Sequence, residues 1–456
     1  MRNIALCLVI ISVATFPGAA SGKKGGAAGS LDATFGANGL VTTDFGGASR
    51  DVATAVAFNP VTSKTIVVGQ TCSGSGCVMS VAQYDASGAL DPTFGAGGRV
   101  TTSFGKYVNE IDAATAVAVD PYDSLPGIYV AGRACPYIIG SGNCYFGLAH
   151  YNDDGSLDGG FGSGGLVTTD IGAITGSSGW YSYANGIAID GIHGYVAVGG
   201  ETCGPQSPNS CYKEFAVAVY FASNGQLYTN FGNLHGVATT DFGAGLPLHS
   251  ANATGIAFDA SGDLIAAGTY LDYSTNRSQF AVACYLYGNG APCPAFAGGT
   301  VLTSFPNGAS ATASGMTVGG FGTIAVAGTS GNNFAVARYR PDGSLDPTFN
   351  QTGIVTTSFG HNVSAAGHGV AELVVNGVGD RIVVAGSAGD KFAMAAYNGD
   401  GSLAWTTTTS FGSGRGIVAS ASGVVIDPFT LKVTAAGYTN ATAAKDNDFA
   451  IARYLQ

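Results

Sequence analysis

Basic residues, and charged residues in general, are scarce in this chain. Its 456 residues include 18 Lys and Arg against 29 Asp and Glu, and charged residues make up only 10%. No dense basic patch is present that could neutralise phosphates, which argues against nucleic-acid binding. A disordered chain is also excluded, because 46% of the residues are hydrophobic.

A long apolar run is missing as well. The longest, Ile4–Phe16, follows Arg2 and precedes the small residues around Ala20; it is shorter than the roughly 20 residues of a membrane-spanning helix. A cationic start, a short apolar stretch and small residues predict a cleaved signal peptide, residues 1–21. We therefore expect a secreted protein, extracellular or periplasmic, with no transmembrane segment and with a flexible mature N-terminus at 22–28.

The familiar catalytic signatures are absent too. There is no Gly-x-Ser-x-Gly elbow, no phosphate-binding loop and no His-Glu-x-x-His. The sequence assigns no catalytic residue, no cofactor and no metal, and an enzyme is the less favoured prediction.

A repeated phrase dominates the chain instead. Gly39-Leu40-Val41-Thr42-Thr43-Asp44-Phe45 recurs at intervals of 52–71 residues. The seven copies reach Phe45, Phe104, Ile171, Phe242, Phe305, Phe359 and Phe411. Three further β-branched or aromatic phrases, bounded by Gly, Asp and Asn, occur in each interval and are typical of strands.

Four strands in each of seven periods predict an all-β, seven-bladed β-propeller with four antiparallel strands per blade, formed by residues 29–456 as one domain. The chain begins with a fourth-strand phrase, 39–45, and ends with a third-strand phrase, 448–454. We therefore expect the N-terminal strand to close the last blade together with the C-terminal strands.

Residues expected to face each other across the third and fourth strands vary together. Arg338 is matched with Asp346, His150 with Asp158, and Arg453 with Asp32 across the closure. Other predicted pairs are Gln83 with Asp91, Val219 with Tyr228, Cys284 with Cys293, and Ala396 with Ala404. Such covariation is expected of cross-strand neighbours.

The cysteines outside the leader lie in close couples, which predicts local disulfides and an oxidising compartment. The couples are Cys72/Cys77, Cys135/Cys144, Cys203/Cys211 and Cys284/Cys293. The alternative, a zinc site, would need four ligands to converge from different blades.

The phrases "QYDASGALDPTFGAGGRVTTSFG" (83–105) and "RYRPDGSLDPTFNQTGIVTTSFG" (338–360) resemble the Delta-60 repeat. That repeat belongs to bacterial, mostly secreted or surface proteins and is regarded as propeller-forming. The chain departs from its pattern at Tyr228, Cys293 and Ala404. The resemblance implies a propeller and no settled activity.

Loops that lead into the innermost strands vary most and are the expected ligand-binding region. The candidate residues are Trp180, Tyr181, His249, His361, His368 and Glu372. Trp180 and Tyr181 can stack on a sugar, and His361 and His368 are spaced to share a metal, although solvated histidines are the simpler interpretation. Glu372 is predicted to face either the axial tunnel or a neighbouring blade.

Hairpin turns after the first strand carry Asn59, Asp120, Asp190, Asp259, Asn376 and Asp427, and the one remaining equivalent position is Gly319. Capping of the turn backbone explains these residues better than a calcium-binding ring does. The sequence thus favours a binding or scaffolding module for an unknown protein or glycan. A hydrolase or lyase and a cell-surface structural protein remain as alternatives.

Overall fold

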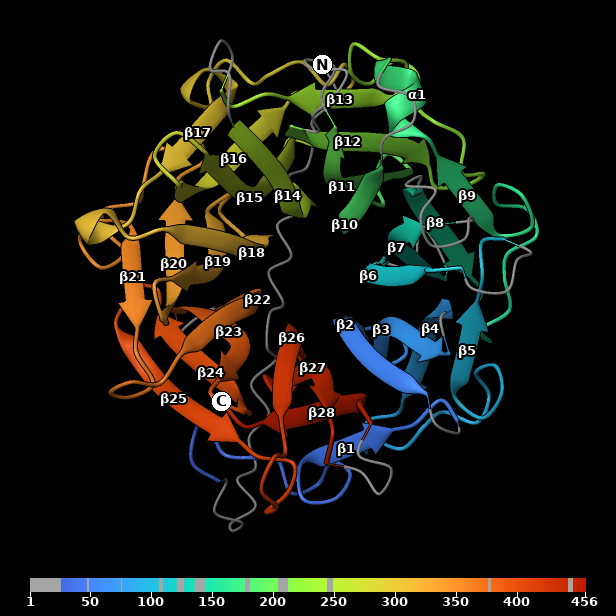
Figure 1. Cartoon of the computed structure of the whole chain (residues 1–456), viewed down its shortest axis with the longest axis vertical. Helices are drawn as coiled ribbons and strands as arrows, with labels where there is room; N and C mark the ends of the chain where they lie inside the picture. Colours follow the sequence, from blue (N-terminus) through green and yellow to red (C-terminus); the bar gives the residue numbers. More distant parts are fainter. Residues whose placement is uncertain are drawn as a thin grey trace, which may run out of the picture.

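Seven four-stranded antiparallel sheets surround one axis (Figure 1). The computed structural model describes residues 26–46, 49–74, 76–105, 110–120, 127–135, 144–176, 181–203, 212–243, 249–375, 379–441 and 446–456. The innermost strands of successive sheets contact one another, and the last contacts the first, so the sheets form a closed ring. The predicted seven-bladed propeller is confirmed, and the predicted signal peptide lies outside the described residues.

In every blade the strands follow one another from the axis outward. Blades 1 to 3 consist of β2 (Arg50–Asn59), β3 (Lys64–Ser73), β4 (Gly76–Tyr84) and β5 (Arg99–Thr102); β6 (Ala113–Val119), β7 (Ile128–Ala134), β8 (Tyr145–Tyr151) and β9 (Leu166–Thr169); and β10 (Ser182–Asp190), β11 (Tyr195–Cys203), β12 (Lys213–Phe221) and β13 (Val237–Thr240). Blades 4 and 5 consist of β14 (His249–Phe258), β15 (Leu264–Asp272), β16 (Arg277–Tyr285) and β17 (Thr300–Thr303); and β18 (Ala311–Val318), β19 (Ile324–Ser330), β20 (Asn333–Tyr339) and β21 (Ile354–Thr357). Blades 6 and 7 consist of β22 (Ala365–Val375), β23 (Gly379–Ala388), β24 (Lys391–Asn398) and β25 (Leu403–Thr409); and β26 (Ala419–Ile426), β27 (Val433–Thr439), β28 (Asp448–Tyr454) and β1 (Leu40–Thr43).

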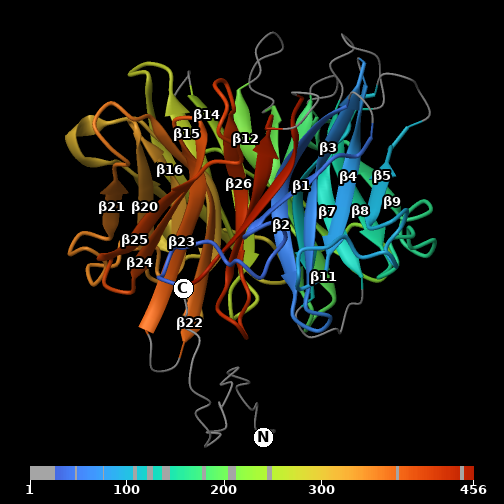
Figure 2. The ribbon, with the colours of Figure 1, turned by 90° about the horizontal axis from the view of Figure 1, so that it is seen from below.

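The strands run between two faces of the ring (Figure 2). Because neighbouring strands are antiparallel, the connections into the innermost strands and the hairpins between the second and third strands share one face. We call this the upper face. The remaining hairpins lie on the lower face.

Strand β1 closes the ring as predicted. It pairs antiparallel with β28, with Leu40 opposite Ala452 and Thr43 opposite Phe449. Next to this pairing, Arg453 Nε donates to Asp32 Oδ2 at 2.8 Å. The two ends of the described chain therefore hold each other in the last blade.

The predicted hairpin pairs are confirmed in most blades. Arg338 Nε donates to Asp346 Oδ2 at 2.9 Å, and the amide of Tyr228 donates to the carbonyl of Val219 at 2.8 Å. The pairing of Ala396 with Ala404 is wrong, because Ala396 lies opposite Trp405. Blade 6 has no counterpart of the Thr348–Phe349 turn, so β25 begins immediately after the hairpin and contains an irregularity there.

A tyrosine–threonine hydrogen bond links each blade to the next. Tyr339 of blade 5, for example, donates its hydroxyl to Thr303 Oγ1 of blade 4 at 2.7 Å, and the tyrosine is fully buried. The other pairs are Tyr84 with Thr43, Tyr151 with Thr102, Tyr220 with Thr169, Tyr285 with Thr240, Tyr397 with Thr357, and Tyr454 with Thr409. Thr43 is the second threonine of the repeated phrase, so this contact gives that residue a structural role.

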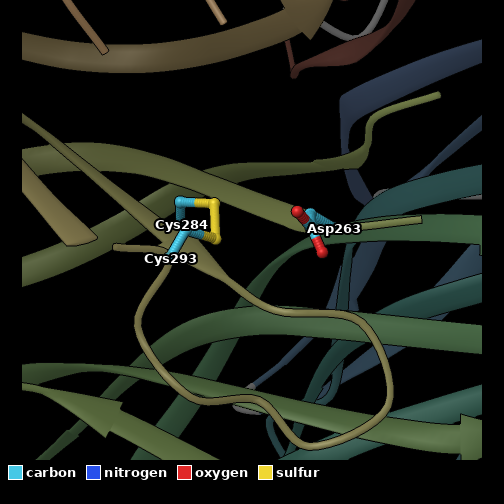
Figure 3. A group of neighbouring side chains, drawn as sticks. All are labelled: Asp263, Cys284 and Cys293. Carbon is cyan, nitrogen blue, oxygen red and sulfur yellow. A yellow bond between two sulfur atoms is a disulfide. The ribbon is translucent and has the colours of Figure 1, made fainter. Parts of the chain in front are cut away.

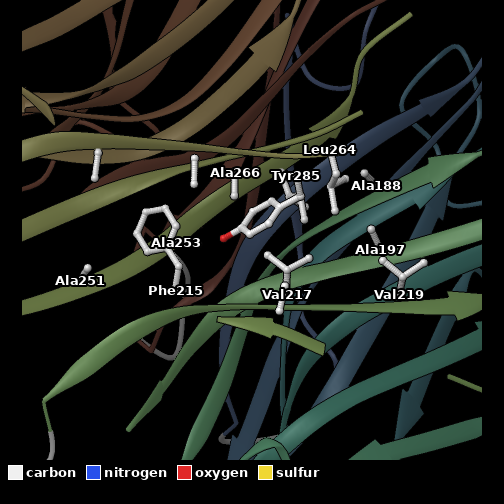
Figure 4. Close-up of a cluster of buried hydrophobic side chains, with 14 of the residues drawn as sticks. Ala188, Ala197, Phe215, Val217, Val219, Ala251, Ala253, Leu264, Ala266 and Tyr285 are labelled. Atoms are coloured by element: carbon white, nitrogen blue, oxygen red, sulfur yellow. The ribbon is translucent and has the colours of Figure 1, made fainter. Parts of the chain in front are cut away.

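Apolar side chains fill the space between blades. In Figure 4, Phe215, Val217 and Val219 of β12 in blade 3 lie against Tyr285 and Leu264 of blade 4. Burial of each such large side chain stabilises the fold by about 1.5–3 kcal/mol. The small residues of the innermost strands let neighbouring blades approach near the axis.

Short helices occur only in connections of the described chain. They are α1 (Ile171–Thr175), η1 (Ala297–Gly299) and η2 (Pro306–Gly308). Helix α1 begins where most blades have Phe-Gly, and the Asp170 side chain accepts a hydrogen bond from the amide of Ala173 at 2.9 Å. This N-cap was not predicted from the sequence. None of the helices in the described part of the chain is long and apolar enough to cross a membrane.

Candidate functional site

A β-bulge in every innermost strand places one polar side chain at the axis. In blade 1 the pairing with β3 shifts between Ala53 and Ala55, so that Thr54 is the extra residue. The seven bulged residues are Thr54, Thr115, Asn185, Thr254, Ser314, His368 and Ser422. All seven line one axial channel with a volume of about 190 Å³.

The bulge explains the glycine in each second strand. A Cβ on Gly69 would lie 2.0 Å from the carbonyl oxygen of Val52, which no side chain can tolerate. In the other six blades the corresponding distance is 1.9 Å. These glycines are Gly132, Gly200, Gly268, Gly328, Gly386 and Gly437.

Hydrogen bonds join the bulged side chains to the next blade. Thr54 Oγ1 donates to the carbonyl of Ala114 at 2.7 Å, and Asn185 Nδ2 donates to that of Ala253 at 2.9 Å. Thr115 and Thr254 make the equivalent contacts. Among the described residues, those that line this channel include no carboxylate and no lysine or arginine. The polar side chains of the channel therefore connect neighbouring blades by hydrogen bonds. The channel itself has space for water or a small polar molecule.

His368 is the titratable member of this ring. It lies within β22 rather than in the loop where the sequence analysis placed it, and its Nδ1 is 2.6 Å from the carbonyl oxygen of Ala421. Because a carbonyl oxygen only accepts, Nδ1 carries the proton and Nε2 is the remaining nitrogen. His361 is exposed in the preceding loop. The two histidines therefore have different environments, which does not support a shared metal site.

Glu372 faces the neighbouring blade and not the axial channel. Its Oε2 would lie 2.7 Å from a Cβ on Gly319, in the turn after β18. Of the two alternatives that the sequence left open, the inter-blade position is the observed one.

Tyr181 belongs to an aromatic and cationic cluster on the upper face. Its ring stacks on Tyr183 with 4.6 Å between centroids, and both rings are partly exposed. Lys213 Nζ lies 5.7 Å from the Tyr181 ring, and the Arg133 guanidinium lies 5.9 Å from the Tyr183 ring. Trp180, predicted to act with Tyr181, lies outside the described residues.

Polar contacts hold the two cations of this cluster. Lys213 Nζ donates to Glu201 Oε1 at 2.8 Å. Burial lowers the pKa of Lys213, but the hydrogen bond and charge of Glu201 outweigh it, so the pKa is raised and the lysine stays charged. Arg133 reaches Gln70 Oε1 at 3.4 Å, while its Nε is buried without a hydrogen-bond partner in the described chain.

Sequence reasoning missed Arg133, Lys213, Tyr183 and Glu201. A signal for two of them was available, because Arg133 and Glu201 directly follow the repeated glycine of the second strand. The other five blades have an uncharged residue there, such as Thr269 or Ser387. That position lies toward the upper end of the blade, and it carries a charged side chain in blades 2 and 3.

His249 lies in a separate cluster with Asp241 and Glu214 on the upper face of blades 3 and 4. The imidazole is buried, and its Nε2 lies 2.5 Å from Asp241 Oδ1. Burial, together with the charge of Asp241, raises the pKa of the buried Glu214. The cluster therefore contains a carboxyl group that holds its proton to a higher pH than a solvated glutamate does.

Three of the predicted disulfides are present. They join Cys72 to Cys77, Cys135 to Cys144, and Cys284 to Cys293. Cys203 is also disulfide-bonded, and its predicted partner Cys211 lies outside the described residues.

Asp263 lies beside the third disulfide (Figure 3). Its Oδ1 accepts a hydrogen bond from the amide of Tyr287 at 2.7 Å. Because the sulfurs of Cys284 and Cys293 are bonded to each other, they are not thiolates and this group is not a zinc site.

Comparison with known families gives one short match. A family model described as a domain of unknown function (DUF5122) beta-propeller matches residues 322–349, which contain β19, β20 and the following hairpin. A comparison with curated proteins finds no match.

Solved structures with a similar arrangement include sialidases. The chain resembles a Trypanosoma rangeli sialidase in complex with sialic acid at 9% identity and a TM-score of 0.42, covering 75% of this chain and 54% of that one. A mutant of the same sialidase displaying trans-sialidase activity gives 9% identity and a TM-score of 0.43, covering 93% and 60%. The chain thus spans little more than half the length of these sialidases, and no residue role follows from the likeness.

Proposed function

We propose that the protein is a secreted binding module of the Delta-60 type. Residues 1–21 act as a cleaved leader and residues 29–456 form one propeller domain. Disulfides between cysteines that are close in the sequence support secretion, because such bonds persist in an oxidising compartment. The ligand in this proposal is a glycan that carries an acidic group, and it binds on the upper face.

The stacked pair of Tyr181 and Tyr183 between Arg133 and Lys213 is the observation that carries this proposal. Partly exposed aromatic rings bind the apolar faces of sugar rings, and a guanidinium binds a carboxylate through paired hydrogen bonds. In the described chain the Arg133 guanidinium reaches the neutral Gln70 side chain at 3.4 Å and pairs with no carboxylate, so a ligand carboxylate would supply that charge. The whole chain is acidic, with a formal net charge of −11, so a site with two cations is locally distinct.

A panel of neutral and uronate-containing oligosaccharides, measured by calorimetry, tests the proposal. Tyr181→Ala is expected to weaken binding at least about fivefold, by analogy with the roughly 1–3 kcal/mol that a nucleobase gains by stacking on an aromatic side chain. Arg133→Gln is expected to remove the preference for acidic sugars. The matched control is Tyr273→Ala, which removes an exposed tyrosine of the same face outside the cluster. Absence of glycan binding, or equal losses in Tyr181→Ala and Tyr273→Ala, would contradict the proposal.

A hydrolase or lyase is the second candidate, supported by Glu214. A buried carboxyl group with a raised pKa beside the Asp241–His249 pair is suited to act as a general acid. In that case Glu214→Gln abolishes turnover of a bound glycan while binding persists. Turnover equal to that of the wild-type protein would rule out this role for Glu214.

A further inference from the structure

Four hairpins of the lower face each expose an apolar side chain at the same position. These hairpins join the innermost strand of a blade to the second strand, and they lie at one end of the ring, the bottom in Figure 2. The exposed side chains are Val61 (54%), Ile192 (85%), Phe321 (67%) and Phe429 (60%). They are half of the eight large hydrophobic side chains that are exposed in the described chain, so they are not scattered singly over the surface.

The repeat places these four side chains at one height. Val61 follows Thr54, the bulged residue at the axis, by seven residues. Ile192, Phe321 and Phe429 follow the bulged residues of their own blades by the same number. Because the bulged residues line one axial channel, residues at an equal distance along the strands lie close to one plane. We call these four residues the apolar ring.

A capped turn holds three of these residues in place. The amide of Val61 donates to Asn59 Oδ1 at 2.9 Å, and the amide of Phe429 donates to Asp427 Oδ1 at 2.9 Å. The amide of Ile192 makes the equivalent bond at 3.1 Å. The backbone amide at the tip is therefore satisfied within the protein while the side chain stays exposed. Such a tip can enter an apolar medium without carrying an unsatisfied amide into it.

We propose that the apolar ring inserts into the interface of a phospholipid bilayer with zwitterionic headgroups. Side chains at one height around an axis match a flat surface, and a bilayer accepts them at any lateral spacing. A protein partner would instead need a separate pocket for each side chain. Affinity for a bilayer scales with the apolar area that is buried, so all four side chains contribute. In this orientation the upper face, with the proposed glycan site, faces away from the bilayer.

Aspartates surround the apolar ring on the same face. They lie in the outer hairpins, between the third and fourth strands, and Asp342 and Asp400 are exposed examples. Hydrogen bonds from neighbouring serine side chains lower the pKa of both carboxyl groups, so they stay ionised at neutral pH. Asp85 and Asp154 are further exposed aspartates of these hairpins.

The charge of the lower face disfavours two other partners. Cations of this face lie beside carboxylates of their own: Lys64 by Asp91, Arg340 by Asp346, and Lys432 and Arg453 by Asp32. The exposed aspartates of the outer hairpins therefore dominate the charge around the ring. They repel an anionic bilayer, and they also repel the same face of a second copy of this chain. A zwitterionic bilayer avoids both repulsions.

Flotation with phosphatidylcholine vesicles tests the proposal. We expect Ile192→Ser, Phe321→Ser and Phe429→Ser each to weaken binding at least about threefold, and the triple variant at least about twentyfold. Ser261 occupies the equivalent position in blade 4, so Ser261→Phe is expected to strengthen binding about threefold. This gain of affinity keeps the test decisive if a loss variant folds poorly. The control Tyr273→Ser removes an exposed aromatic side chain of the upper face and is expected to bind as the wild type does.

Fluorescence and sedimentation complete the test. The emission of Phe429→Trp is expected to shift to the blue on addition of vesicles and to be quenched by lipids brominated in their acyl chains. No flotation with zwitterionic vesicles, equal flotation of the wild type and the triple variant, or a requirement for anionic lipid would overturn the proposal. A dimer in analytical ultracentrifugation that the triple variant abolishes would assign the ring to a second copy and overturn it as well. None of these results depends on glycan binding, so the apolar ring and the proposed function succeed or fail separately.

Discussion

The carboxylate of Glu372 lies where Gly319 lacks a side chain. Its Oε2 is 2.7 Å from the position of a Cβ on Gly319. In other blades this turn begins with a capping residue; Asp259 Oδ1, for instance, accepts hydrogen bonds from the amides of Ser261 and Asp263 at 2.8 and 2.9 Å. A glutamate from blade 6 thus stands at a turn of blade 5 where most blades use their own aspartate or asparagine.

Restoring aspartate at the turn is expected to conflict with this glutamate. Gly319→Asp places two carboxylates in the same space and is expected to lower the free energy of unfolding by about 1–3 kcal/mol. Glu372→Ala removes the charge and is also expected to destabilise. The free energy of unfolding of the double variant is expected to exceed, by about 0.5–3 kcal/mol, the value obtained by adding the two single losses.

Urea denaturation of the wild type, both single variants and the double variant measures this coupling. Additive effects would show that Glu372 and the turn act independently. Glu372→Gln serves as the control, because it keeps the shape and removes only the charge.

Each tyrosine–threonine hydrogen bond is expected to make its own contribution to the free energy of unfolding. Tyr339→Phe leaves Thr303 Oγ1 buried without its partner, which is expected to cost about 1–3 kcal/mol of unfolding free energy. Combining it with Thr303→Val removes both polar groups and is expected to recover part of that loss. If the double variant is as unstable as the sum of the single variants, the hydrogen bond is not the cause.

Acid is expected to weaken the closure of the ring through Asp32. Burial raises the pKa of Asp32, but hydrogen bonds from Thr34 and Lys432 and the charge of Arg453 outweigh it and hold the pKa far below its usual range. In the unfolded chain the Asp32 carboxylate therefore binds a proton at a pH at which it remains ionised in the native chain. This contribution to stability is present above about pH 5 and is lost as the pH falls toward about 2.

Chemical denaturation at several pH values between 2 and 6 measures this effect. Asp32→Asn is expected to flatten the acid limb of the stability curve, whereas the control Asp153→Asn, at an exposed turn position, is expected to preserve it. An unchanged acid limb in Asp32→Asn would contradict the prediction.

The disulfides are expected to differ in their resistance to reduction. Cys284 and Cys293 are 4% and 3% exposed, while Cys72 and Cys77 are only partly buried. Under mild reductant, alkylation and mass spectrometry are expected to detect Cys72 and Cys77 first. Loss of either bond is expected to lower the free energy of unfolding by roughly 2–3 kcal/mol, given the short loops. Earlier labelling of Cys284 would contradict this order.

Several features of the candidate sites required coordinates. Tyr181 was predictable as a loop aromatic, but its neighbours Arg133 and Lys213 come from other strands, and Arg133 from another blade. Likewise, His368 was assigned to a loop because a sequence pattern does not mark where a strand begins. Only the register of β22 with β23 shows that His368 is a bulged residue at the axis.

The sequence alone determined the number of blades, the strand order, the closure by residues 39–45 and the local pairing of cysteines. These features depend on strand patterns and turns that repeat along the chain, and on partners a few residues apart or at equivalent places in the repeat. Tertiary structure decided which residues meet between blades, such as Glu372 with Gly319 and Asp51 with Asp448. An alternating strand pattern separates the two faces of a sheet, but it does not specify what a neighbouring sheet places opposite each face.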